Sequence, residues 1–146
     1  MDTFRQCRDK YLDFWRSSNL IGMKNLISID YKAREISGGE IVDFGYAESI
    51  EGWEQGFRFV EENNAQWIVN EVAIYPLRAD ETLVILTATM NINGKLIETT
   101  NLFFVTFKKN SDGEWKVVRS YIEPFALSFQ SSNLLIFKTL FRCSDI

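Results

Sequence analysis

The chain has 146 residues, of which 46% are hydrophobic and 14% aromatic, enough for one ordinary domain with a single core. Sixteen basic and twenty acidic residues give a net charge of −4, and no dense Lys/Arg cluster is present, which argues against a nucleic-acid partner. The absence of histidine removes the most common general base and the most common zinc ligand, and Cys7 and Cys143 are too far apart in the chain for a metal-binding or redox motif. We therefore expect no metal and no cofactor, and any acid–base chemistry must use carboxylates, Tyr, Lys or Arg.

The N-terminal stretch MDTFRQCRDKYLDFW is charged and helical in pattern, and it lacks the basic-then-apolar layout of a signal peptide. No apolar run approaches the roughly 20 residues that are needed to span a bilayer. We therefore expect a cytoplasmic protein with no membrane partner.

The N-terminal segment predicts two helices. Apolar residues recur at helical spacing over residues 3–18, at Phe4, Cys7, Tyr11, Phe14 and Trp15. Asn19 is a favoured N-cap residue and would start a second, short helix. Two short strands are then expected between 31 and 46, joined by the turn Ser37-Gly38-Gly39.

A third helix is expected after Ser49, a good N-cap residue, and it would end at Asn63-Asn64. From Trp67 onward the pattern is typical of β-strands. The expected strands are 67–75, stopped by Pro76, and then 82–92, 95–108 and 115–123. Asn93-Gly94 is a strong hairpin signal, and residues 110–113 form a second tight turn.

This order predicts a single α+β domain over residues 1–146, with three helices packed on one face of a curved, mostly antiparallel sheet. The core covers about residues 3–125. The extension 126–146, ALSFQSSNLLIFKTLFRCSDI, is too apolar to remain free in solution. It would add a helix or a strand that covers the mouth of a pocket or extends a dimer interface.

The strand GEWKVVRSYIEPF has an unusual polar end. By the two-residue period of a strand, one face carries Trp115, Val117, Arg119, Tyr121 and Glu123. If the two apolar residues face the core, the three polar residues do so as well. They would then form a polar pocket floor, in which Arg119 holds an anionic or carbonyl-bearing ligand. The alternative is a salt bridge at the rim, with water on one side.

Three passages in their order and spacing carry a resemblance: KYLDFWRSSNLIGMKNLISIDYKARE, SIEGWEQGF and NLFFVTFKKNSDGEWKVVRSYIEP. Over about residues 3–125 the chain resembles the nuclear transport factor 2-like superfamily, and in it the ketosteroid isomerase and SnoaL-like branch. The resemblance implies a cystatin-like, cone-shaped fold around one pocket, and homodimers that pack sheet to sheet. Because the superfamily contains enzymes and plain binding domains, it leaves the function class open.

The resemblance also implies positions for catalytic groups. The oxyanion-binding Tyr of ketosteroid isomerases falls on Tyr11, and their carboxylate base falls on Glu35. Their third group falls near Phe103, whose ring cannot donate a hydrogen bond, whereas Asn101 on the same strand face can. A core role for Tyr11 and a solvated position for Glu35 are the alternatives.

The sequence thus predicts a small-molecule-binding domain for an apolar ligand that bears a carbonyl or carboxylate. If it is an enzyme, Glu35 or Glu123 is the base and Tyr11 or Tyr121 the donor in a cofactor-independent isomerisation, dehydration or cyclisation. Ligand contacts are predicted for Arg119, Asn101, Trp15, Trp53, Phe57 and Phe103. The competing class is a non-catalytic homodimerisation or protein-interaction module, supported by the apolar tail and by the sheet-face residues Leu102, Phe104, Val118 and Ile122.

Overall fold

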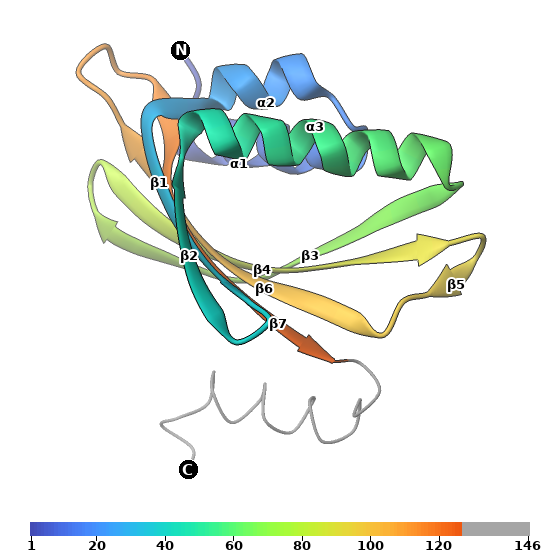
Figure 1. Cartoon of the computed structure of the whole chain (residues 1–146). Coiled ribbons are helices and arrows are strands. Elements are labelled where there is room, and N and C mark those ends of the chain that lie inside the picture. Colours follow the sequence, from blue (N-terminus) through green and yellow to red (C-terminus); the bar gives the residue numbers. More distant parts are fainter. Residues whose placement is uncertain (127–146) are drawn as a thin grey trace.

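The computed structural model describes residues 1–126, the last two by their backbone alone, and shows three helices on one side of a curved sheet (Figure 1). The helices are α1 (Phe4–Arg16), α2 (Leu20–Leu26) and α3 (Tyr46–Glu62). The strands are β1 (Ile27–Ser37), β2 (Glu40–Gly45), β3 (Ala65–Arg78), β4 (Glu81–Ile92), β5 (Lys95–Leu96), β6 (Thr99–Lys109) and β7 (Trp115–Ala126). The predicted α+β class, with its three helices, is confirmed. The apolar extension lies outside the described residues, apart from the backbone of Ala126.

The order of the strands places α3 across the sheet. The seven-stranded sheet runs β2-β1-β7-β6-β4-β3, with β5 paired to β4, and only the β1–β7 pair is parallel. Because α3 follows β2 and precedes β3, it connects the two opposite ends of this order. Its 17 residues span about 25 Å, which is long enough to cross the concave face of the sheet. A cavity between the helices and the sheet must lie beneath it.

The first residues of α2 and α3 are both stabilised by side-chain capping, but α3 begins earlier than predicted. Asn19 caps α2 as expected, because its side-chain oxygen accepts a hydrogen bond from the Gly22 amide at 2.9 Å. Helix α3 begins at Tyr46 rather than after Ser49. The carboxylate of Glu48 accepts a hydrogen bond from the Gly45 amide at 3.1 Å and satisfies this helix end. The cap prediction for Ser49 is therefore wrong.

The strand predicted to stop at Pro76 continues to Arg78. Pro76 lies opposite Thr82 in the β3–β4 pair, next to a register irregularity. Proline lacks an amide hydrogen, but β3 is an edge strand of this sheet, where one side of the backbone needs no strand partner. The stop signal failed because a sequence does not show which strand lies at an edge.

The predicted turns are confirmed. Asn93 and Gly94 both have positive φ angles, 53° and 79°, as a two-residue hairpin turn requires. In the turn before β7, the Asn110 side-chain oxygen accepts hydrogen bonds from the amides of Asp112 and Glu114, and Gly113 has a φ of 82°. The strand expected over 95–108 is divided into β5 and β6.

A β-bulge in β7 decides which side chains face the helices. Phe107 of β6 pairs with Val117, whereas the preceding Thr106 pairs with Arg119. β7 therefore has one extra residue, Val118, in this interval. An extra residue inverts the alternation of side chains beyond it, because that alternation has a period of two.

Beyond the bulge, Ser120 and Ile122 face the helices and are each 7% exposed. Arg119 and Tyr121 therefore point to the opposite face, where both are exposed. The prediction that Arg119, Tyr121 and Glu123 share the face of Trp115 and Val117 is wrong for this reason.

Candidate functional site

A cavity of about 500 Å³ lies between the helices and the concave face of the sheet. Aromatic residues are the largest group in its lining: Tyr11, Trp15, Tyr31, Phe44, Trp53, Trp67 and Phe103. Its polar lining comes from Glu35, Asp43, Glu48, Ser49, Asn101 and Ser120. An apolar cavity with a few convergent polar groups is the usual form of a small-molecule site.

Trp15 of α1 is the centre of the aromatic wall and is 1% exposed. Its ring meets Trp53 of α3 at 4.8 Å, Phe103 of β6 at 4.9 Å and Trp67 of β3 at 6.0 Å, with interplanar angles of 79°, 72° and 73°. Tyr11 stands at 90° to Trp53. These edge-to-face contacts are favourable, and they fix the rings as walls at near-right angles.

Glu35 of β1 is half-buried in this lining, with Val42 and Ile122 as its strand neighbours. Within residues 1–126 it forms no hydrogen bond and no ion pair. Burial therefore raises the pKa of its carboxyl group above the ordinary value. A carboxylate in such surroundings is a stronger base than one in water.

Two buried phenols lie in the same cavity. Burial, together with the nearby Tyr31, raises the pKa of Tyr11 well above its ordinary value, so this phenol keeps its proton at neutral pH. Burial also raises the pKa of Tyr31, while hydrogen bonds from the side chains of Ser120 and Ser49 lower it. Each phenol is therefore available as a hydrogen-bond donor.

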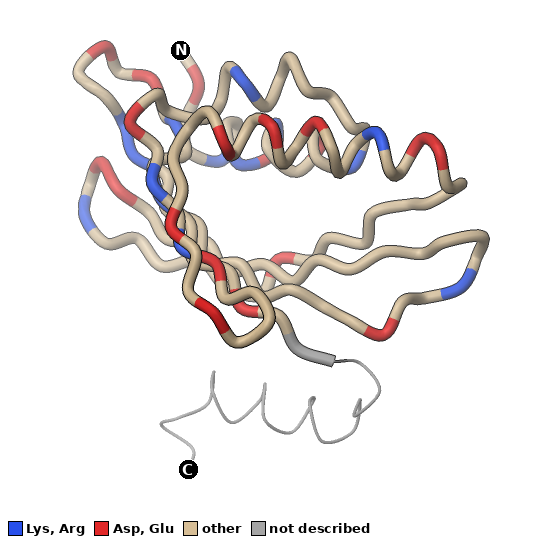
Figure 2. The backbone as a smooth tube through the Cα atoms, in the orientation of Figure 1, with Lys and Arg blue, Asp and Glu red and all other residues tan. Residues whose placement is uncertain are grey.

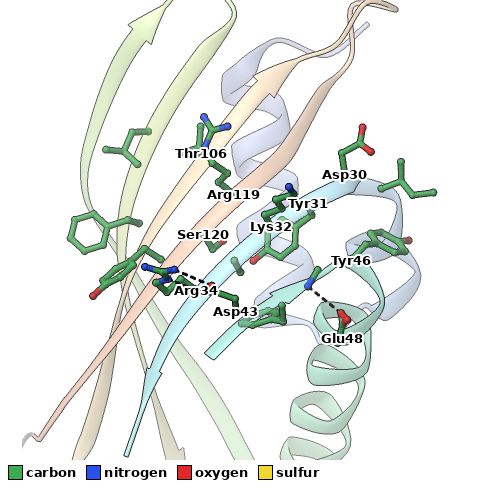
Figure 3. Close-up of a pocket in the computed structure, with 17 residues that line it drawn as sticks. Asp30, Tyr31, Lys32, Arg34, Asp43, Tyr46, Glu48, Thr106, Arg119 and Ser120 are labelled. Carbon is green, nitrogen blue, oxygen red and sulfur yellow. Dashed lines mark hydrogen bonds and ion pairs between the residues drawn. The ribbon is translucent and has the colours of Figure 1, made fainter. Parts of the chain in front are cut away.

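The other two carboxylates of the lining are already engaged. Arg34 of β1 donates two hydrogen bonds to Asp43 of β2, at 2.7 and 2.9 Å, and hydrogen bonding to this guanidinium holds the pKa of Asp43 below its ordinary value. Glu48 accepts from the Gly45 amide. Figure 3 shows both contacts in a second, wider hollow of about 970 Å³ along β1, β2 and β7. Among the lining carboxylates, Glu35 is the one without a described partner.

Three solved structures place this arrangement among known folds. A ketosteroid isomerase-like protein from Erwinia carotovora atroseptica matches with a TM-score of 0.60 at 14% identity, over 83% of this chain and 92% of its own. An NTF2-like protein with a cystatin-like fold from Novosphingobium aromaticivorans matches with a TM-score of 0.62 at 15% identity, over 82% and 77%. A putative calcium/calmodulin-dependent protein kinase type II association domain from Thiobacillus denitrificans matches with a TM-score of 0.66 at 16% identity, over 86% and 97%.

The chain has the nuclear transport factor 2-like fold. At this identity the likeness shows the fold alone, and it confirms the predicted cystatin-like cone. The sequence matches no family model, and it matches no curated protein.

Six of the predicted site residues line the cavity of this nuclear transport factor 2-like fold: Tyr11, Trp15, Glu35, Trp53, Asn101 and Phe103. Phe57, also predicted, is buried beside Trp53, with ring centroids 5.5 Å apart, and does not reach the lining. The cavity combines residues of α1, α3, β1 and β6, as the resemblance implies.

The three polar residues predicted from β7 do not line the cavity. Arg119 instead pairs with Glu81 of β4, with 2.6 Å between Nη2 and Oε2, and Arg78 contacts the same oxygen at 3.0 Å. The Glu81 side chain is only 7% exposed, so the two arginines stabilise a buried carboxylate. The Tyr121 hydroxyl donates to Glu123 at 2.8 Å. The predicted pocket floor is therefore a polar network on the outer face of the sheet.

Sequence reasoning missed the lining residues Ser120, Ile122 and Trp67. The first two were assigned to the wrong face because of the bulge. For Trp67 a signal existed in α3, where Gly52 and Gly56 are spaced four residues apart and share one helix face. A Cβ atom at Gly56 would lie 3.5 Å from the Trp67 ring, an ordinary van der Waals distance, so the indole packs directly against this side of the helix.

Within residues 1–126, no group of three His, Cys, Asp or Glu side chains is placed to hold a metal ion. No described helix is long and apolar enough to cross a membrane. Cys7 is buried, and burial raises the pKa of its thiol to about 12, so this group is not a nucleophile at neutral pH.

Proposed function

We propose that this protein binds a small, largely apolar molecule in the aromatic cavity and that Glu35 exchanges a proton with it. The observation that carries the proposal is the position of Glu35, a half-buried carboxylate without a described partner, facing an aromatic cavity of about 500 Å³. Such a group acts as a general base on a carbon acid that is bound beside it.

The chemistry needs a base and a donor on the same ligand. Glu35 removes a proton from a carbon next to a carbonyl group, and negative charge develops on the carbonyl oxygen. A buried phenol that remains protonated, such as Tyr11, donates a hydrogen bond to that oxygen, and the Asn101 amide is a second donor. Return of the proton at another carbon completes an isomerisation, and loss of a leaving group completes a dehydration. Neither step requires a cofactor.

The structure does not support the expectation of an anionic ligand. It depended on Arg119, which is paired with Glu81 on the other face of the sheet. No lysine or arginine lines the cavity. We therefore restrict the proposed ligand to molecules that are not anions.

A neutral proton-transfer probe tests the proposal without knowledge of the ligand. The probe is 5-nitrobenzisoxazole, which opens when a base removes the proton on carbon 3 as the ring N–O bond breaks, and gives a coloured nitrophenolate. We expect saturable turnover. Gly52 of α3 lines the cavity, and a Cβ atom there meets nothing within 4 Å. Gly52→Leu therefore takes up part of the space for the probe and should lower kcat/KM at least about tenfold.

The matched control is Ala47→Leu, an exposed position in the first turn of α3 that does not line the cavity. This variant should retain the rate of the unmodified protein. Equal rates for Gly52→Leu and the control, or turnover no faster than with free acetate at the same concentration, would exclude the cavity as a site of proton transfer.

An observation on the outer face supports a second function, homodimerisation. Leu83 and Phe104 lie half-buried on the side of the sheet away from the helices, next to Ile85 and Leu102, which are only 3% and 5% exposed. No described helix covers this side of the sheet (Figure 1). Phe104 also contacts Tyr121, with ring centroids 6.0 Å apart. An apolar patch of this kind suits a second copy of the same sheet. Of the residues predicted for this patch, Ile122 belongs to the cavity instead.

We expect Phe104→Glu to convert a dimer into a monomer, because a carboxylate at the centre of an apolar interface would be desolvated without a partner. Light scattering coupled to size exclusion measures the mass directly. Phe59→Glu is the control, since Phe59 is 42% exposed on α3, far from the patch in the fold. A wild-type protein that is monomeric at high micromolar concentration would reject this proposal.

A further inference from the structure

The charged side chains that line the cavity all have the same sign. Its lining contains Glu35, Asp43 and Glu48, and it contains no lysine or arginine. Arg34 neutralises Asp43, and a backbone amide bonds to Glu48, which leaves Glu35 without a described counter-charge. A charged ligand that enters here meets carboxylates and no fixed cation.

Helix α3, which lies over the cavity, is also rich in acidic residues. Helix α3 carries five glutamates and a single arginine, and Figure 2 shows the acidic positions distributed along the helix. Of these glutamates only Glu48 lines the cavity, and Glu54 pairs with Arg58 at 2.8 Å. The helix as a whole keeps an excess of negative charge, which favours the approach of a cation over that of an anion.

The aromatic walls act in the same direction. Three of the four tryptophans of the chain, Trp15, Trp53 and Trp67, line the cavity, together with Tyr11 and Phe103. The face of an indole attracts a cation through its quadrupole, more strongly than the face of a phenol or phenyl ring. Trp15 is fully buried behind the other two and holds their rings in place, so Trp53 and Trp67, which are half-buried, are the indoles with ring surface left for a cation.

Extending the proposed binding function, on which this step rests, we propose that the ligand is an organic cation, a quaternary or protonated amine whose nitrogen lies beside the half-buried Trp53 and Trp67 with Glu35 as its counter-charge. The amine supplies a positive charge, which no side chain of the lining provides. The cavity is larger than an ammonium head group alone, so the rest of the molecule extends along the aromatic wall.

Three probes of one shape and different charge test the inference. They are choline, its neutral carbon isostere 3,3-dimethylbutan-1-ol and the anion 3,3-dimethylbutanoate. Each is titrated into uniformly ¹⁵N-labelled protein while the indole N–H signals are followed by NMR. Choline should shift the signals of Trp53 and Trp67. The signal of Trp115, which packs against Phe4 outside the cavity, is the internal control.

We expect choline to bind roughly tenfold more tightly than the neutral isostere, and the anion to bind most weakly. Glu35→Gln should remove much of the advantage of choline and leave the affinity for the alcohol unchanged. Equal affinity for choline and the alcohol, or no shift with choline, would overturn the inference. Neither result would affect the proposed proton transfer, because its nitrobenzisoxazole probe is uncharged.

Discussion

Replacement of Trp15 by alanine will lower the free energy of unfolding by about 3–5 kcal/mol, as expected for the loss of a fully buried aromatic side chain. Trp15 is 1% exposed and contacts Tyr11, Trp53, Trp67 and Phe103. Its removal therefore leaves a void at the junction of α1, α3 and the sheet, and the remaining rings lose their edge-to-face partner. Urea denaturation followed by circular dichroism measures the change.

The control for this prediction is Ile21→Ala. Ile21 is 73% exposed in α2, and alanine is the better helix former, so its replacement should change stability by no more than about 0.5 kcal/mol. Trp15→Phe should fall between the two variants, because a smaller ring still fills part of the site. A loss below about 1 kcal/mol for Trp15→Ala would contradict the packing described for this cavity.

The helices and the sheet were predictable from local chemistry. The apolar spacing of α1, the Asn19 cap and the turns at Asn93-Gly94 and 110–113 each have a cause within a few residues. Predictions from local sequence were wrong where the outcome depends on the position of a residue in the whole sheet. Pro76 is tolerated because β3 lies at an edge, a property that depends on the order of all the strands.

The candidate site was predictable to the extent that it depends on regular geometry. Tyr11 and Glu35 were assigned by resemblance, and both line the cavity. The prediction failed on β7, because a single extra residue at Val118 exchanged the faces of every later residue. No composition or periodicity within 115–123 marks a bulge. Its position became clear only from the pairing with β6.

The partner of Arg119 could not be predicted from the strand pattern either. The bulge turns Arg119 away from the helices, and Glu81, two strands away in the sheet order, pairs with it there. Glu81 is distant in the sequence, so a periodicity within one strand does not reveal the pair. Ser120, the next residue, lines the cavity beside Tyr31.

Glu35→Gln will lower kcat/KM for the nitrobenzisoxazole probe by roughly 10²-fold or more, because glutamine has the shape of glutamate but cannot accept the proton. The base acts in its ionised form. The rate of the unmodified protein should therefore rise with pH and level off only above a pKa that burial has raised beyond the ordinary range of glutamate. The pH profile of Glu35→Gln should lack this transition.

The same substitution should stabilise the fold at neutral pH. Since burial raises the pKa of Glu35 in the folded state, the folded protein binds its proton more tightly than the unfolded chain does. Stability therefore falls as the pH rises from the unfolded pKa through the folded pKa, and the penalty is fully present above the latter. Glutamine carries no charge and avoids the penalty, so Glu35→Gln should have the higher melting temperature at pH 7, and this difference should disappear in acid.

The control is Glu40→Gln, an exposed carboxylate of β2 that does not line the cavity. It should change neither the rate nor the melting temperature. A structural role for Glu35 predicts a loss of stability, and a solvated role predicts no change in either quantity. A catalytic carboxylate whose burial destabilises the fold predicts that Glu35→Gln is less active and more stable. A loss of stability, or no change in either quantity, would remove Glu35 from the proposed chemistry.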